Sequence, residues 1–174
     1  GGTQSTLNYG NTKTNLYGLA INFNNYDYVP LPTSGIGVVA SFSTGIRNSS
    51  AINDTTSVKN TVYKGDLNIQ WYLALAKRHV FRFSNHTQLY QAPNFFTNEA
   101  YRFGGLQSQR GFNEQFLLAT ARTTLSVEYR FMLERTSFLF AFYDQSWYEN
   151  NTAQYYRDFP MGVGAGFTFG TNIG

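Results

Sequence analysis

The sequence predicts an all-β fold in which about seven antiparallel strands form part of a transmembrane β-barrel. Three observations favour it over a soluble sheet. Apolar and polar residues alternate with a period of two along most of the 174 residues, which is the period of a strand. Charged residues within the second to sixth predicted strands fall on the polar side of this alternation. The connections between the strands alternate between short and long. Both features are typical of a barrel whose outside meets lipid.

The composition agrees with strands that have one apolar and one polar face. Charged residues make up 13% and aromatic residues 18% of the chain, while the mean hydropathy is only −0.33. No run of about 18 apolar residues indicates a transmembrane helix. The absence of cysteine excludes a disulfide framework, and a net charge of +3 does not indicate nucleic-acid binding. No secretory signal is visible, so we expect any export signal to lie outside this sequence.

The first four predicted strands span residues 14–26, 35–47, 63–76 and 79–91. Their apolar sides consist of Tyr17, Leu19, Ile21 and Phe23, of Ile36, Val38, Ala40, Phe42 and Ile46, of Leu67, Ile69, Trp71, Leu73 and Leu75, and of Phe81, Phe83 and Leu89. Their polar sides carry Gly, Ser, Asn and Gln together with Arg47, Lys64, Asp66, Arg82 and His86. Because strand residues alternate between faces, the apolar side is expected to face lipid and the polar side the lumen.

The last three predicted strands span residues 119–132, 136–148 and 161–171. The fifth sets Leu125, Val127, Tyr129 and Phe131 against Arg122, Thr124, Ser126, Glu128 and Arg130. The sixth, "TSFLFAFYDQSWY", follows the same rule if Asp144 lies on its polar side. The seventh sets Val163, Ala165, Phe167 and Phe169 against three glycines and Thr168. The stretch "GIGVVA" lies inside a strand, so no dinucleotide site is predicted, and neither histidine belongs to a metal-binding motif.

The predicted connections fall into two groups that emerge at opposite ends of the strands. Residues 27–34, 77–78 and 133–135 are short to moderate, whereas 48–62, 92–118 and 149–160 are long. Barrels of bacterial outer membranes have short turns on the periplasmic side and long loops outside. The alternation therefore places the long segments together on the external side.

The longest connection contains "RFGGLQSQRGF", with a fixed positive charge in a chain poor in charge. Gly104 and Gly105 permit a sharp turn, and Phe112 offers a bulky anchor. Arg110 cannot be deprotonated, and Glu128 and Asp144 lie on the polar sides of two neighbouring strands. Two interpretations remain from these residues. The loop folds inward and Arg110 binds both carboxylates, or Arg110 is a solvated loop arginine without a fixed partner.

Four segments in this order resemble the outer-membrane insertase and translocase superfamily, the BamA-, TamA- and FhaC-like group. They are "FGGLQSQRGF", "LSVEYRF", "FAFYDQSW" and "GVGAGFTFG". The resemblance is specific over residues 103–170. It implies that residues 92–118 are the sixth external loop, which folds back into the lumen. Its tip would be Arg110, Gly111 and Phe112, and Arg110 would pair with Glu128 and Asp144 on the inner wall.

This sequence also departs from the family pattern. Gln109 stands where an apolar residue is common, and Ser146 where glycine is common. The family barrel has sixteen strands, two of which follow the "GVGAGF" strand, and periplasmic POTRA domains precede it. We therefore interpret residues 1–174 as one partial barrel domain, the later part of such a barrel without its final two strands.

The resemblance implies a function in inserting outer-membrane proteins or passing polypeptides across a bacterial-type outer membrane. It implies no enzyme activity and no cofactor. The expected partners are outer-membrane lipid, unfolded outer-membrane or secreted client polypeptides, the remaining barrel strands, and periplasmic domains or accessory subunits. Two alternatives remain: a passive porin or surface-antigen barrel, and a soluble β-sheet module that binds a partner.

Overall fold

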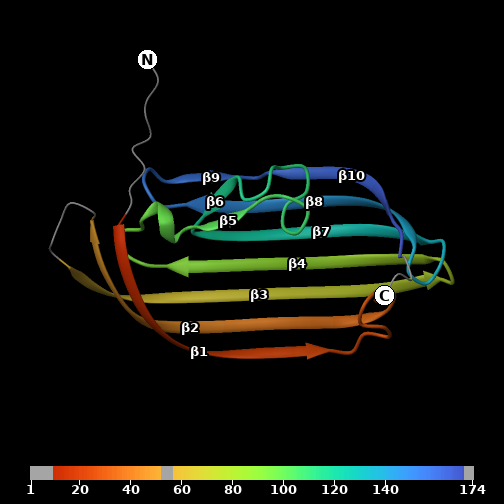
Figure 1. The fold of residues 1–174 in the computed structure, drawn as a ribbon, viewed down its shortest axis with the longest axis horizontal. Coiled ribbons are helices and arrows are strands. Elements are labelled where there is room, and N and C mark those ends of the chain that lie inside the picture. Colours follow the sequence, from red (N-terminus) through yellow and green to blue (C-terminus); the bar gives the residue numbers. More distant parts are fainter. Residues whose placement is uncertain (1–9, 52–56, 171–174) are drawn as a thin grey trace, which may run out of the picture.

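A single antiparallel sheet dominates the computed structural model, which describes residues 10–51 and 57–170 (Figure 1). Seven strands lie side by side in chain order: β1 (Gly10–Asn24), β2 (Gly35–Ala51), β3 (Val58–Ala76), β4 (His79–Gln91), β7 (Ala121–Met132), β8 (Phe138–Asn150) and β10 (Met161–Thr168). A short strand, β9 (Tyr156–Asp158), also pairs with β8. The predicted all-β antiparallel fold is confirmed. Within the described residues, no helix has the length and apolar character needed to cross a membrane.

The long connection between β4 and β7 has structure of its own. It contains a 3-10 turn, η1 (Thr97–Glu99), and two short strands, β5 (Tyr101–Phe103) and β6 (Leu117–Ala119), which pair with each other. In Figure 1, β5, β6 and the loop tip lie over β7 and β8, whereas η1 lies at the end of the strands. The connection therefore folds back onto one side of the sheet. We call this side the inner face and the opposite side the outer face.

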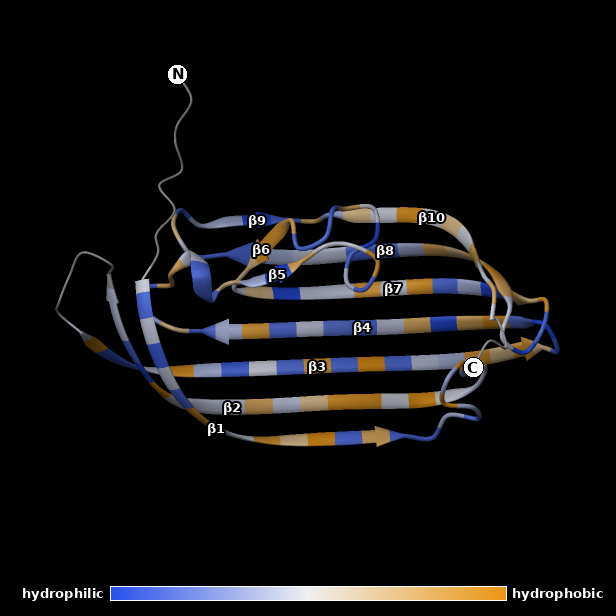
Figure 2. Ribbon diagram, viewed as in Figure 1, coloured by the Kyte–Doolittle hydropathy of each residue, from blue (hydrophilic) through white to orange (hydrophobic). Residues whose placement is uncertain are grey.

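The two faces of the sheet differ in chemistry, and apolar and polar residues alternate along much of the strands (Figure 2). Leu19 and Val163 are 84% and 78% exposed on the outer face, and Leu125 and Phe167 are also exposed there. Contiguous exposed apolar surface on this scale marks contact with a membrane or a partner rather than with water. On the inner face, by contrast, Glu128 and Asp144 are buried.

Antiparallel pairing places residues of the same face opposite each other on neighbouring strands. Ser126 lies opposite Asp144, and Arg82 lies opposite Glu128, so the inner polar residues form rows across neighbouring strands. On the outer face, the rings of Trp71 and Phe83 lie 5.3 Å apart across β3 and β4. Cross-strand pairs of this kind fix the register, because a shift of one residue would move every side chain to the wrong face.

Several predicted strand ends are wrong, most clearly at the end of β2 and β3 from which the long connections emerge. The predicted connection 48–62 is largely strand, because β2 continues to Ala51 and β3 begins at Val58. Asn48 still pairs with Lys59 there. Most residues in this region are polar, and Val58 and Val62 lie on the side that is polar in the rest of β3, so no hydrophobic alternation revealed the strands. Residues 52–56 lie outside the described residues.

Smaller differences occur at other strand ends. The first strand begins earlier than predicted, at Gly10, and ends at Asn24. The seventh predicted strand ends at Thr168, and residue 171 lies outside the described residues. Backbone pairing to the neighbouring strand sets these ends, and the sequence pattern does not record it.

The described sheet is open. The strand order begins at β1 and ends at β10, and these two strands form no pairing with each other among residues 10–51 and 57–170. An edge strand in lipid would carry backbone N–H and C=O groups without partners, which is costly because lipid offers no hydrogen bonds. Both edges therefore require further strands or another partner within a membrane.

The assignment of faces predicts different environments for spin labels on the two faces of the sheet. The chain contains no cysteine, so single cysteines can carry nitroxide labels at Leu125 and Phe167 on the outer face and at Asn68 and Gln88 on the inner face. In membranes, dissolved oxygen should increase the spin relaxation of the labels at Leu125 and Phe167 more strongly. A water-soluble nickel chelate should increase the relaxation of the labels at Asn68 and Gln88 more strongly. Equal access of oxygen to all four positions would contradict the assignment.

Candidate functional site on the inner face

The loop tip is built from a compact turn that begins at two glycines. Gly104 and Gly105 have φ angles of 115° and 94°, in the left-handed region that glycine adopts without strain. The backbone N–H of Gly105 donates to the carbonyl of Gln109 over 3.0 Å, and the N–H of Gln109 donates back over 3.2 Å. The Ser108 hydroxyl accepts from the Gly104 N–H over 2.8 Å. These bonds close the turn and direct residues 109 and 110 toward the sheet.

A small apolar cluster fixes the base of this turn on the inner face. Phe103 of β5 and Leu117 of β6 are buried together with Tyr148 of β8, and the rings of Phe103 and Tyr148 meet edge to face with centroids 5.2 Å apart. Phe112 packs against the same cluster. Burial of these aromatic rings ties the loop to β8 on both sides of the tip.

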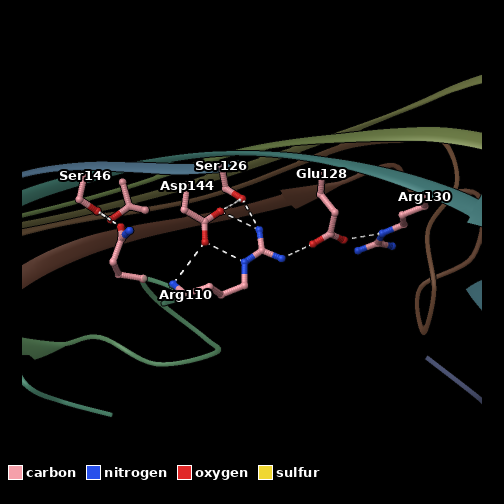
Figure 3. Close-up of polar contacts among 8 residues, drawn as sticks. Arg110, Ser126, Glu128, Arg130, Asp144 and Ser146 are labelled. Carbon is pink, nitrogen blue, oxygen red and sulfur yellow. Dashed lines mark hydrogen bonds and ion pairs between the residues drawn. The ribbon is translucent and has the colours of Figure 1, made fainter. Parts of the chain in front are cut away.

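Arg110 lies at the centre of the site and binds two carboxylates (Figure 3). Its Nε donates to Oδ2 of Asp144 over 2.7 Å, and its Nη2 donates to Oδ1 of the same carboxylate over 2.7 Å. Its Nη1 donates to Oε2 of Glu128. The backbone N–H of Arg110 also reaches Asp144, at 3.3 Å. The planar guanidinium is suited to this two-point contact, whereas a lysine ammonium is not.

The surroundings of Arg110 balance its charge and shield it from water. Glu128 also accepts a hydrogen bond from Nε of Arg130 over 2.8 Å, so two arginines face two carboxylates. The guanidinium carbon of Arg110 lies 3.6 Å from the centre of the Phe142 ring, a favourable cation–π contact. Such a group is stable only as a complete set, because removal of one member leaves a buried charge without a partner.

Ser126 connects Arg110 and Asp144 in a second way. Its hydroxyl donates to Oδ1 of Asp144 over 2.5 Å and accepts from Nη2 of Arg110 over 2.8 Å. Ser126 and Asp144 are direct neighbours across β7 and β8. The pairing of these two strands therefore assembles the surface that receives the arginine.

The two positions that depart from the family pattern contact each other. Gln109 and Ser146 are 0% and 1% exposed, and the Ser146 hydroxyl donates to Oε1 of Gln109. Thr124 of β7 completes the group, with its hydroxyl 2.6 Å from that of Ser146. Ser146 thus satisfies the buried carbonyl oxygen of Gln109, whereas the buried Nε2 of Gln109 has no hydrogen-bond partner among the described residues.

The mutual dependence of Gln109 and Ser146 can be tested with a double-mutant cycle. Ser146→Ala leaves the buried carbonyl oxygen of Gln109 without its partner, so we expect this variant to lose about 1–3 kcal/mol of folding stability. Gln109→Leu leaves the Ser146 hydroxyl with Thr124 as a partner, so its loss should be smaller. The double variant removes both groups, and its loss should be smaller than the sum of the two. Urea unfolding of the four proteins measures this, and simple additivity would contradict the pairing.

Close backbone approach allows the tip to rest on β10. A Cβ atom at Gly162 would lie 2.0 Å from the carbonyl oxygen of Arg110, which is far inside contact distance. Gly111 follows with a φ of 94° and lies beside Gly162, because its own Cβ would be 3.6 Å from the Gly162 Cα. Glycine at both positions lets the loop backbone and the β10 backbone meet directly.

The structure brings the residues singled out in the sequence to one place, although in different roles. Arg110, Glu128 and Asp144 are in direct contact. The sequence-level interpretation of Arg110 as a solvated arginine without a partner is therefore wrong. The glycines shape the turn, and Phe112 packs on the apolar cluster.

Sequence reasoning missed two contacts of the arginine, Ser126 and Phe142. Both lie on the inner face, two residues from Glu128 and Asp144 respectively, and this spacing was the signal that could have found them. The site binds a loop through charge, hydrogen bonds and an aromatic ring. In the described part of the chain, no group of three or more His, Cys, Asp or Glu side chains could hold a metal ion.

Comparison with known families gives a match that covers nearly the whole chain. The family described as the Omp85 superfamily domain matches residues 2–174. A comparison with curated proteins found no match. The family match includes the four strands before the loop, where the sequence resemblance rested on pattern alone.

Proposed function

Because the chain belongs to the Omp85 superfamily, we propose that it forms part of the barrel of a machine that inserts proteins into the outer membrane or passes polypeptides across it. The superfamily is one of outer-membrane protein insertion and translocation. In either case its clients are unfolded outer-membrane or secreted polypeptides.

The inward-folded loop is the single observation that carries the proposal. Arg110 is bound by Asp144 and Glu128 within a largely shielded group, and the tip rests on β10 at Gly162. This arrangement joins the loop to β7, β8 and β10, and β10 is the strand at one open edge of the sheet. A loop fixed in this way can hold the inner wall in shape while backbone groups at the edge remain available to a client strand.

The proposal requires no covalent chemistry, cofactor or metal. Arg110, Glu128 and Asp144 act by holding the loop, and none of them is proposed as a catalytic residue. The apolar outer face supports a location in the outer membrane. Partners at the open edges would be further barrel strands, and periplasmic domains or accessory subunits would meet the short-turn end.

Reconstitution of the whole protein tests the proposal. An unfolded β-barrel client is added to liposomes that contain the purified protein. Protease protection and the heat-dependent shift in gel mobility measure how much client is inserted. For a translocase, the readout is protection of a secreted client inside the vesicle. Empty liposomes and liposomes with an unrelated porin are the controls.

A passive barrel gives a different outcome in the same experiment. Conductance and diffusion of small solutes, with client insertion and translocation no faster than in the porin control, would reject the proposal. That outcome would support the alternative of a passive porin or surface antigen. Solubility of the whole protein without detergent would reject every barrel function.

A further inference from the structure

The first part of the long connection, residues 92–100, lies across the end of the sheet from which the long connections emerge (Figure 1). It follows β4, yet it contacts the two strands beyond β3. The Asn98 side chain accepts from the Gly10 N–H of β1 over 3.3 Å and donates to the Gly10 carbonyl over 3.1 Å. Arg47 of β2 binds the same segment. Residues 92–100 therefore bridge β4 to β1 and β2.

Arg47 is the main polar contact between this segment and the sheet. The side chain is completely buried. Its Nη1 donates to the Pro93 carbonyl over 2.9 Å and its Nη2 donates to the Asn94 carbonyl over 2.7 Å. Its Nε lies 3.1 Å from Oε1 of Glu99, whose side chain is also buried. A buried guanidinium needs such partners, so the segment and the arginine depend on each other.

Glu99 in turn is held by groups on both sides. Its Oε1 accepts from the Tyr90 hydroxyl of β4 over 3.1 Å, and its Oε2 accepts from the Phe96 N–H over 3.0 Å. The carboxylate thus joins Arg47 of β2 to Tyr90 of β4. Because β3 lies between these two strands, this contact spans three strands at the end of the sheet.

Apolar packing seals the same segment against the strands. Phe95 packs with Val62 of β3 and with Tyr90, whose ring centre is 5.2 Å from that of Phe95. The Phe96 ring lies directly over Gly10, where a Cβ atom would be 2.5 Å from the ring. Two neighbouring phenylalanines therefore contact three strands, Phe95 on β3 and β4 and Phe96 on β1.

We infer that residues 92–100, which we call the cap, close the long-loop end of the inner face to solutes, and that Arg47 locks the cap independently of the loop tip. The cap is bound by β1, β2, β3 and β4, whereas the tip is bound by β7, β8 and β10. The polar contacts described for Arg47 and for Arg110 have no residue in common. Release of the cap should therefore change permeability without releasing the tip, because distant sites without shared partners act separately.

The test compares Arg47→Ala with Lys59→Ala in the whole protein. Lys59 is an exposed cation of β3 at the same end of the sheet, so its removal controls for loss of positive charge. For Arg47→Ala we expect higher conductance in planar bilayers and chymotryptic cleavage at Phe95 or Phe96 that is about tenfold faster or more. Cleavage at Phe112 and client handling should stay at the level of the parent protein. Lys59→Ala should leave all four measurements unchanged.

Three results would overturn the inference. Faster cleavage of the cap without increased conductance means that the cap does not close the lumen. Equal acceleration of cleavage at Phe112 means that the cap and the tip open as one unit. Arg47→Ala protein with cap cleavage and conductance equal to those of the parent means that Arg47 does not lock the cap. If Arg47→Ala does not fold, Arg47→Lys takes its place and is judged by the same outcomes, because it keeps the charge but cannot donate to the Pro93 and Asn94 carbonyls together.

Discussion

Replacement of Arg110 by alanine is expected to release the loop tip and to reduce barrel stability and client handling together. The substitution leaves Asp144 and Glu128 buried without their shared partner and removes the ring contact with Phe142. Removal of one partner from a buried ion pair costs on the order of 3 kcal/mol. Urea unfolding of the whole protein measures the stability, and the client assay measures the function.

Companion variants separate the geometry of the guanidinium from its charge. Arg110→Lys keeps the charge but cannot form the two-point contact with Asp144, so it should rescue only part of the loss. Glu128→Gln and Asp144→Asn should each have milder effects that do not add fully to that of Arg110→Ala, because the three residues act as one unit. Full rescue by lysine, or full additivity, would contradict this description of the site.

Replacement of Gly162 by alanine should displace the loop tip from the other side. The new Cβ would lie 2.0 Å from the Arg110 carbonyl oxygen, and a backbone atom cannot move aside as a flexible side chain can. Overpacking of this kind typically costs about 1–3 kcal/mol. A spin label at the exposed Leu106 should become more mobile, and unfolding should require less urea.

Ala165→Val is the matched control for Gly162→Ala. It also enlarges a small residue of β10, but Ala165 is exposed on the outer face, so the tip should not respond. In the Arg110→Ala background, Gly162→Ala should have a much smaller further effect, because the tip has already been released. An unchanged label at Leu106 in Gly162→Ala alone would show that the close approach does not hold the tip.

The period-two alternation predicted every long strand, because a barrel wall between lipid and a polar interior leaves a strong pattern. The pattern failed where most residues are polar and the two valines, Val58 and Val62, do not continue the alternation of the rest of β3. Residues 48–51 and 58–62 extend β2 and β3 by backbone pairing, yet they were predicted to be a connection. It also missed β5, β6 and β9, each only three residues long. Such short strands depend on partners that are brought together by the tertiary fold.

The candidate site was predictable in part. Charge on a defined face selected Glu128 and Asp144, and the glycines around Arg110 indicated a turn. The sequence alone did not indicate that Gln109 and Ser146 meet, because they lie on a loop and on a distant strand. Nor did it indicate that Gly162 makes room for the Arg110 backbone. Both contacts follow from the position of the tip, which only the assembled inner face determines.

The position of Arg110 in the chain has a consequence for the order of assembly. Arg110 precedes its partners Ser126, Glu128 and Asp144, and Ser126 and Asp144 become neighbours only when β7 and β8 pair. Gly162, which supports the tip, comes later still. Local hairpins close faster than contacts that join distant segments. The tip therefore cannot bind all its partners until β7, β8 and β10 have paired. We expect docking of the tip to follow formation of this part of the sheet.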